Sequence, residues 1–313
     1  MGCFQHNPSD LTGRFKLAAR DMDITLHIGP HRTATTSFQN YLRQSREDLL
    51  AQGVAVWGPG ITRDKTRLLT GRIKAVSASG AQRLVVSEEN LAGSVRRNLK
   101  DASLYLGIGD RVARFARDLG GNVSSILLSP RSLDVFWCSS IAFAAARGLP
   151  LPDQKKRAAI AMGRRGWRDV ISEIAMALPD TRIRVLPFDQ YAGRPDRFLA
   201  DGAGINGPIC KNRAPVNVSP RLPDLRRALH ASGQDASSLP FGMGRWNPFT
   251  SEEHSALREL YADDMMWLTA GADGLATLIE DRSATKAGTN LPCAALEKGQ
   301  FDEFEERRMA RPG

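Results

Sequence analysis

The sequence has no long hydrophobic run and no recognisable secretion signal. The first absence argues against an integral membrane protein, and the second argues against a secreted one. No segment approaches the roughly 18 apolar residues that a membrane-spanning helix needs, so we expect no membrane span. The N-terminal stretch MGCFQHNPSDLTGRFK lacks the apolar core of a signal peptide. Because no targeting signal is recognised, the sequence predicts a cytoplasmic protein.

Cysteine is scarce: the chain has 4 cysteines, and they lie far apart. None forms a C-x-x-C pair and none has a histidine nearby at the spacing of metal ligands. This pattern argues against a disulfide framework and favours a reducing compartment. We therefore also expect no bound metal.

Lysine is scarce too, because arginine supplies most of the basic charge. Lys and Arg together number 43 against 34 Asp and Glu, a net charge of +9, yet the printed sequence has about nine lysines. Arginine binds phosphate and sulfate with two parallel hydrogen bonds, although an arginine excess also arises from genomic base composition. Basic residues nowhere form a run of five, and there is no long run in which aromatic residues interleave with them, so we expect no nucleic-acid partner.

The order of the predicted elements indicates an α/β fold. Short apolar runs typical of buried strands alternate with helical patterns, which implies a parallel sheet flanked by helices. One helix is expected to carry Phe38, Tyr41, Leu42, Leu49 and Leu50 on one face. The predicted strands are 24–28, 54–57, 83–87, 123–128 and 182–188, and further helices are expected near 112–119, 133–147, 155–178 and 251–268, the last with Ser251 as its cap.

No internal repeat divides the chain. We expect a polar lead-in over residues 1–20, one α/β domain over 21–283 and a polar tail over 284–313. Residues 200–250 are rich in Gly, Pro, Asn and Ser, and the sequence predicts that they form loops over one end of the sheet.

The most informative segment follows the first predicted strand and reads GPHRTATTS, residues 29–37. A turn from a strand into a helix directs backbone N–H groups and the positive end of the helix dipole at one point. Arg32 adds a charge there, and four hydroxyl residues add donors, which together suit phosphate or sulfate. Ordinary helix capping is the alternative reading of the hydroxyl cluster. The segment is neither a Gly-Lys-[Ser/Thr] phosphate loop nor a G-x-G-x-x-G dinucleotide loop.

Two further groups of residues follow later strands. Arg131 follows the strand at 123–128, and Ser139 lies eight residues on, so the two can converge on one anion; a surface Arg and an ordinary helical Ser are the alternative. Glu88 and Glu89 follow the strand at 83–87, where a carboxylate can serve as a base. An acidic pair at a helix start is the alternative for these two residues.

Segment 29–37 resembles the 5′-phosphosulfate loop of PAPS-dependent sulfotransferases, especially the carbohydrate enzymes of the Golgi and their bacterial relatives, where G-P-x-K-T-G-T-T is typical. Gly29, Pro30, Thr33, Thr35 and Thr36 match this motif. Two positions depart from it, because Arg32 replaces the family lysine and Ala34 replaces the family glycine. The family also has a strand-end Arg with a Ser eight residues later, which bind the 3′-phosphate, and a S-[SA]-E-[NDH]-[LF] segment whose Glu is the base.

The resemblance implies a P-loop-like fold of three layers and a nucleotide cofactor, PAPS. The sulfuryl group of PAPS would be transferred to a hydroxyl or amine acceptor, which the sequence does not identify, and PAP would be released. By this resemblance Arg32 assists the leaving group and Glu89 is the base, with His31 as an alternative proton acceptor. The residues implied in cofactor binding are Pro30, His31, Arg32, Thr33, Ala34, Thr35, Thr36, Ser37, Arg131 and Ser139.

Two other functions stay open at this point. A protein that kept the fold and the nucleotide site but lost the chemistry is one, because of the departures at Arg32 and Ala34. A P-loop kinase is the other, with Thr36 and Glu89 as poor substitutes for its metal-binding residues. Residues 212–219 also resemble a loop over the nucleotide in bacterial relatives, and 242–247 is either a lid or a plain loop.

Overall fold

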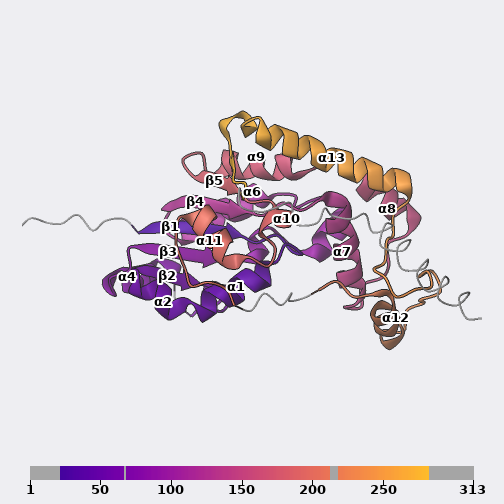
Figure 1. Cartoon of the computed structure of the whole chain (residues 1–313), viewed down its shortest axis with the longest axis horizontal. Coiled ribbons are helices and arrows are strands. Elements are labelled where there is room, and N and C mark those ends of the chain that lie inside the picture. Colours follow the sequence, from indigo (N-terminus) through magenta and orange to yellow (C-terminus); the bar gives the residue numbers. More distant parts are fainter. Residues whose placement is uncertain (1–21, 67, 212–217, 282–313) are drawn as a thin grey trace, which may run out of the picture.

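A computed structural model of the chain describes residues 22–66, 68–211 and 218–281. Its described strands form one sheet of six parallel strands in the order β2-β3-β1-β4-β5-β6 (Figure 1). This arrangement confirms the expected α/β class. The strands are β1 (Asp23–Ile28), β2 (Val54–Trp57), β3 (Arg83–Ser87), β4 (Val123–Leu128), β5 (Arg182–Val185) and β6 (Thr277–Leu278).

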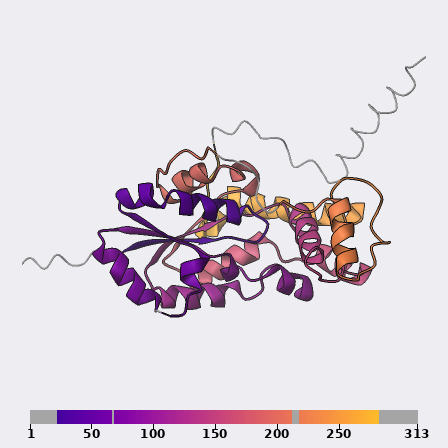
Figure 2. The same ribbon diagram turned by 90° about the horizontal axis from the view of Figure 1, so that it is seen from below.

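Helices connect the strands and cover both faces of the sheet, so that the fold has three layers (Figure 2). The α-helices are α1 (Thr35–Gln44), α2 (Arg46–Ala51), α3 (Pro59–Thr62), α4 (Leu69–Ala78), α5 (Val95–Asp101), α6 (Ile108–Asp118), α7 (Leu133–Ala145), α8 (Gln154–Ala161), α9 (Trp167–Ala177), α10 (Phe188–Tyr191), α11 (Pro195–Ala203), α12 (Leu222–Ala231) and α13 (Ser251–Thr269). Short 3₁₀ turns η1 (Glu89–Leu91) and η2 (Ala272–Gly274) complete the described elements.

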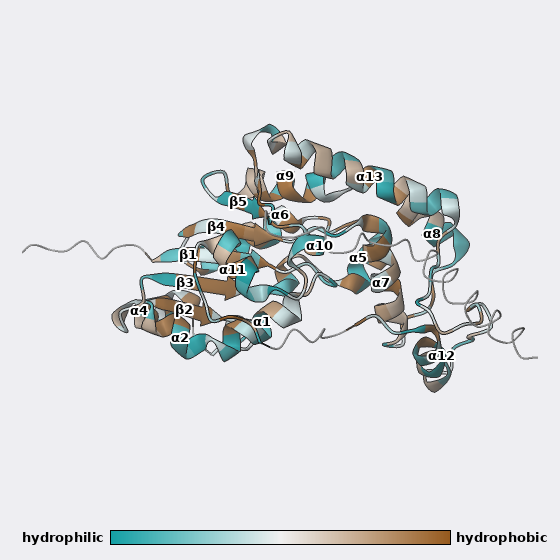
Figure 3. Ribbon diagram, viewed as in Figure 1, coloured by the Kyte–Doolittle hydropathy of each residue, from teal (hydrophilic) through white to brown (hydrophobic). Residues whose placement is uncertain are grey.

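Buried apolar residues lie on both faces of the sheet, and each face has its own core; Figure 3 shows the hydrophobic stretches of the strands. Leu26 of β1 faces the helices that follow β3 and β4, among them α6 and α9. His27, the next residue, faces the opposite layer, where its ring packs edge-on against Phe38 of α1 and Phe198 of α11. The alternation of side chains along a strand thus assigns each residue to one layer.

The register of the sheet determines where the site forms. Ile28 pairs with Leu128, and His27 pairs with Ser87, so β1, β3 and β4 end at the same edge of the sheet. The chain after β1 crosses to one face, whereas the chain after its neighbours crosses to the other face. Ligands of open α/β sheets bind at this kind of edge.

Two predictions of a single continuous helix are wrong, because the structure has two separate helices in each of these stretches. The helix after β1 is interrupted at Ser45, a serine whose backbone departs from helical geometry, and α2 begins at the next residue. The helix expected over 155–178 ends with α8 and restarts with α9 after Gly166. A Cβ at Gly166 would overlap the carboxylate of Asp264, which accepts hydrogen bonds from the first N–H groups of α9.

Three smaller expectations also need correction. The strand expected to reach residue 188 stops at Val185, and Pro187 precedes α10, consistent with the loss of a backbone donor at proline. The cap of α13 is Thr250, whose hydroxyl accepts from the N–H of Glu253, and not Ser251. Residues 200–250 hold the unpredicted helix α12, although its buried leucines recur at helical spacing.

None of the described helices is both long and apolar enough to cross a membrane. The lead-in 1–20 and the tail 284–313 lie outside the described residues, so the expected domain division stays a prediction.

Candidate functional site

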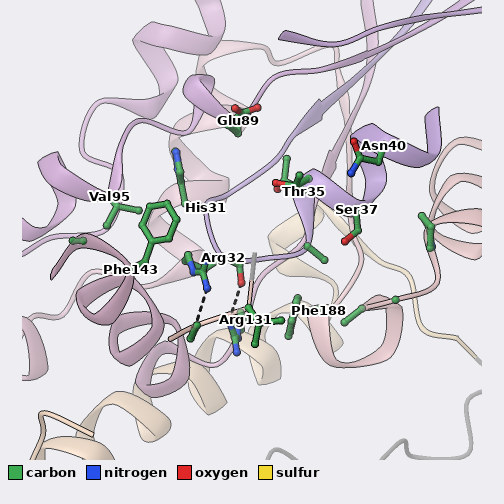
Figure 4. Close-up of a pocket in the computed structure, with 18 of the residues that line it drawn as sticks. His31, Arg32, Thr35, Ser37, Asn40, Glu89, Val95, Arg131, Phe143 and Phe188 are labelled. Atoms are coloured by element: carbon green, nitrogen blue, oxygen red, sulfur yellow. Dashed lines mark hydrogen bonds between the residues drawn. The ribbon is translucent and has the colours of Figure 1, made fainter. Parts of the chain in front are cut away.

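A cleft of about 840 Å³ lies at the carboxyl edge of the sheet, and residues from each of the three groups that the sequence singled out line it (Figure 4). His31 and the first turn of α1 line it, together with Glu89 after β3 and Arg131 after β4. Its volume is that of a typical site for a small molecule or cofactor.

The loop between β1 and α1 is closed by two threonines. The hydroxyls of Thr33 and Thr35 both donate to the carbonyl oxygen of Pro30, over 2.7 and 3.0 Å, and both side chains are buried. Gly29 is required beneath them, because a Cβ there would overlap Thr35. Two of the four expected hydroxyl donors therefore stabilise the loop itself.

The N-terminus of α1 opens into the cleft without a side-chain cap. No side chain caps at Ala34, and the first turn has no acidic residue. Ordinary capping therefore does not explain the hydroxyl cluster. The N–H groups of the first turn and the positive helix end face the space that Thr36 and Ser37 line, an arrangement that attracts anions.

Arg32 and Ala34 both have left-handed backbones, with φ of 67° and 60°. Alternation of left-handed and ordinary residues turns successive N–H groups toward one point and forms an anion-binding nest. The left-handed backbone at Ala34 explains why glycine suits this position, because a Cβ is strained there.

We expect Ala34→Gly to raise the free energy of unfolding by about 1 kcal/mol, since it removes that Cβ strain. Chemical denaturation measures the change. Ala159→Gly is the matched control, because Ala159 is exposed in α8 and glycine there should cost about 1 kcal/mol. Equal destabilisation by both substitutions would contradict the strain at Ala34.

The structure separates the roles of the two adjacent glutamates. Glu88 is buried, forms an ion pair with Arg63 at 2.5 Å and accepts from the N–H of Asn90, so it holds η1 in place. Glu89 lines the cleft and accepts from Gln39 at 2.6 Å and from Arg63 at 2.7 Å. Partial burial raises the pKa of Glu89, but the hydrogen bonds from Gln39 and Arg63 outweigh it and lower the pKa below its usual value.

His31 lies on the same side of the loop as Glu89 (Figure 4). Its backbone N–H donates to the hydroxyl of Tyr105 at 2.9 Å, while its Nδ1 is buried and has no hydrogen-bond partner among the described residues. Burial lowers the pKa of His31, and the opposing effect of Glu89 does not reverse this. The imidazole is therefore neutral at neutral pH and retains an unused polar atom at the cleft.

Arg32 connects Arg131 with Ser139, the pair that the sequence singles out, although of these two only Arg131 lines the cleft. Arg131 donates to the carbonyl oxygen of Arg32 at 2.8 Å and stacks on Phe188. The Nε of Arg32 donates to the hydroxyl of Ser139 at 2.8 Å. Ser139 itself is buried beneath this contact, so Arg32 reaches Ser139 from the cleft.

Positive charge dominates the cleft. Burial, and after it the guanidiniums of Arg131, Arg147 and Arg245, lower the pKa of Arg32 to about 10. Arg147 stacks on the ring of Phe143, 3.5 Å from its centroid. No described carboxylate forms an ion pair with Arg32, Arg147 or Arg245, so a bound anion is the natural counter-charge.

Sequence reasoning missed several cleft residues. Arg147 and Phe143 follow Ser139 on the same helical stretch, but nothing in their spacing marks them. Ser219 and Arg245 lie in two segments that the sequence did mark, 212–219 and 242–247. Of the first segment, residues 212–217 lie outside the described residues. Arg245 belongs to the second, in which Trp246 is buried and Met243 is exposed.

Comparison with models of protein families, with curated proteins and with solved structures finds no match to this chain.

Proposed function

We propose that this protein binds PAPS and transfers its sulfuryl group to a hydroxyl or amine acceptor. One observation carries the proposal: the uncapped N-terminus of α1 and the Arg131 guanidinium line the same cleft, although about a hundred residues separate them in the chain. A nucleotide with anionic groups on both its 5′ and its 3′ side needs two such positions. The motif resemblance at residues 29–37 supports the same assignment.

The described residues fit the two anionic ends of PAPS. The N–H groups at the start of α1 suit the 5′-phosphosulfate, because they are not used by a cap. Arg131 suits the 3′-phosphate, since it lines the cleft on the opposite side of the loop from Glu89, and Ser139 supports this end through its hydrogen bond from Arg32. A cleft of about 840 Å³ also leaves room for part of an acceptor.

In the proposed reaction the acceptor oxygen or nitrogen forms a bond to sulfur while the bond between sulfur and the bridging phosphate oxygen breaks. Glu89 takes the acceptor proton, and PAP leaves with the bridging oxygen. The helix end stabilises the charge that develops on that oxygen. As in phosphoryl transfer, positioning and electrostatics supply most of the rate.

A binding protein that lacks the chemistry is the second candidate. Arg32 extends toward Ser139 and not toward the first turn of α1, where the family lysine acts by resemblance. We disfavour a P-loop kinase, because the loop has no Gly-Lys pair. A cytoplasmic location belongs to the same proposal.

Transfer of ³⁵S from labelled PAPS to a panel of alcohols, phenols, amines and oligosaccharides separates the candidates. A sulfotransferase labels at least one acceptor class and releases PAP in equal amount. PAP binding without labelling of any acceptor favours the binding protein. Absence of PAP binding excludes both candidates.

A further inference from the structure

The side chain of Arg32 extends in a direction that its place in the sequence of the loop does not predict. Its left-handed backbone, with φ of 67°, lies between His31 and Thr33. Figure 4 shows that His31 points toward Glu89, whereas the Arg32 side chain lies on the side of Arg131. The loop therefore divides its two consecutive side chains between the two ends of the cleft.

The guanidinium of Arg32 makes two hydrogen bonds far along the chain. Its Nε donates to Ser139 at 2.8 Å, and its Nη2 donates to Ser219 at 3.0 Å. The two serine hydroxyls lie 2.6 Å apart, so the three side chains form one network. The loop after β1, helix α7 and the segment before α12 thus meet at Arg32.

Arg32 also contacts Arg131, through its backbone carbonyl oxygen. Arg131 donates to the carbonyl oxygen of Arg32 at 2.8 Å, which ties the end of β4 to the loop. The Arg32 guanidinium lies 4.7 Å from the ring centroid of Phe143, and Arg147 stacks on that ring as well. Three guanidiniums therefore gather at one place, which suits a group with two negative charges.

We infer that Arg32 is a ligand of the 3′-phosphate together with Arg131, and that Ser219 positions it there. The inference rests on the proposed function and concerns how that site selects its nucleotide. Arg32 then distinguishes PAP from 5′-AMP, and the amides of the loop and of α1 hold the 5′ end. The planar fork of arginine accounts for the departure from lysine, because Nε and Nη2 donate to Ser139 and Ser219 from fixed positions while Nη1 remains for a phosphate oxygen.

Calorimetric titration with PAP and with 5′-AMP tests the inference, and the readout is the ratio of their dissociation constants. Wild-type protein should bind PAP at least about 100-fold more tightly. Arg32→Ala should lower this ratio about 10- to 100-fold and change 5′-AMP binding by less than about threefold, since charged hydrogen bonds to the 3′-phosphate are lost. Ser219→Ala should lower the ratio less, and in the same direction.

Arg97→Ala is the matched control, because Arg97 is exposed, pairs with Asp101 and does not line the cleft. It removes one charge and should leave the ratio unchanged. Arg32→Lys distinguishes a lost contact from a folding defect. It keeps the charge, so its melting temperature should stay near that of wild type, while the ratio of the PAP and 5′-AMP dissociation constants should show less preference for PAP.

Two results would overturn the inference. If Arg32→Ala weakens PAP and 5′-AMP equally, Arg32 serves the 5′ end or acts only through general charge. If Arg32→Ala leaves both affinities intact, Arg32 binds neither end of the nucleotide. Failure of the proposed function looks different, because wild-type protein itself would then bind PAP no better than 5′-AMP.

Discussion

Glu89→Gln should lower kcat for sulfuryl transfer about 100- to 10,000-fold and leave PAP binding nearly unchanged. This range is the usual contribution of a general base. The substitution keeps the shape of the side chain, removes its capacity to take a proton and weakens its contacts with Gln39 and Arg63. Single-turnover transfer from ³⁵S-labelled PAPS measures the chemical step, and calorimetry with PAP measures the binding.

The pH dependence provides an independent test of the same residue. Because its hydrogen bonds to Gln39 and Arg63 outweigh burial, the pKa of Glu89 lies below its usual value, and the carboxylate is ionised at neutral pH. Activity should therefore be constant near neutrality and fall as the pH drops through that lowered pKa, where the base becomes protonated. Arg63→Gln removes one of these hydrogen bonds and should move this limb to higher pH.

Glu88→Gln is the matched control for the adjacent position. Glu88 is buried against Arg63, so its substitution should lower the melting temperature more than Glu89→Gln does, because the Glu89 side chain is less buried in its own pair with Arg63. A Glu89→Gln variant with full activity would show that the base lies elsewhere. His31→Ala would then be the next variant, since its neutral imidazole has an unused Nδ1 at the cleft.

Arg131→Ala should weaken PAP binding about 100-fold or more. The guanidinium is buried at the end of β4, where a charged hydrogen bond to phosphate is worth about 1.5–3 kcal/mol, and two such bonds are expected from its planar fork. The variant also loses the hydrogen bond to the carbonyl oxygen of Arg32, which loosens the loop. Its effect should therefore exceed that of Arg32→Ala.

Isothermal titration of the variant with PAP and with 5′-AMP measures this effect. The loss should be much larger for PAP, because only PAP carries the 3′-phosphate. Arg131→Lys should recover part of the PAP affinity through its charge, but not the fork geometry. Equal losses for the two nucleotides would argue against a 3′-phosphate site at Arg131.

The sequence predicts the architecture well, because buried parallel strands leave short apolar runs between turn residues. All five strands expected from the sequence are present, and β5 is only shorter than expected. The shared edge of the sheet then brings the loop after β1, Glu89 and Arg131 together, as the alternation of strands and helices indicates. Helix breaks at Ser45 and Gly166 escape prediction, because they depend on local geometry and on a carboxylate from α13.

Details of the site depend on contacts that no local pattern encodes. The left-handed backbones at Arg32 and Ala34 are uncommon for residues with a side chain, so the sequence alone does not indicate them. Ser219 reaches Arg32 across 187 positions. Nor does the sequence show that Thr33 is used to close the loop, since a hydroxyl next to an arginine is equally suited to a ligand.

A crystal structure with PAP tests the central claim most directly, namely that one cleft holds both phosphates of the nucleotide. We expect the 5′-phosphate within hydrogen-bond distance of the N–H groups at the start of α1, and the 3′-phosphate against the guanidinium of Arg131. A 3′-phosphate in open solvent, or PAP bound outside this cleft, would contradict the account.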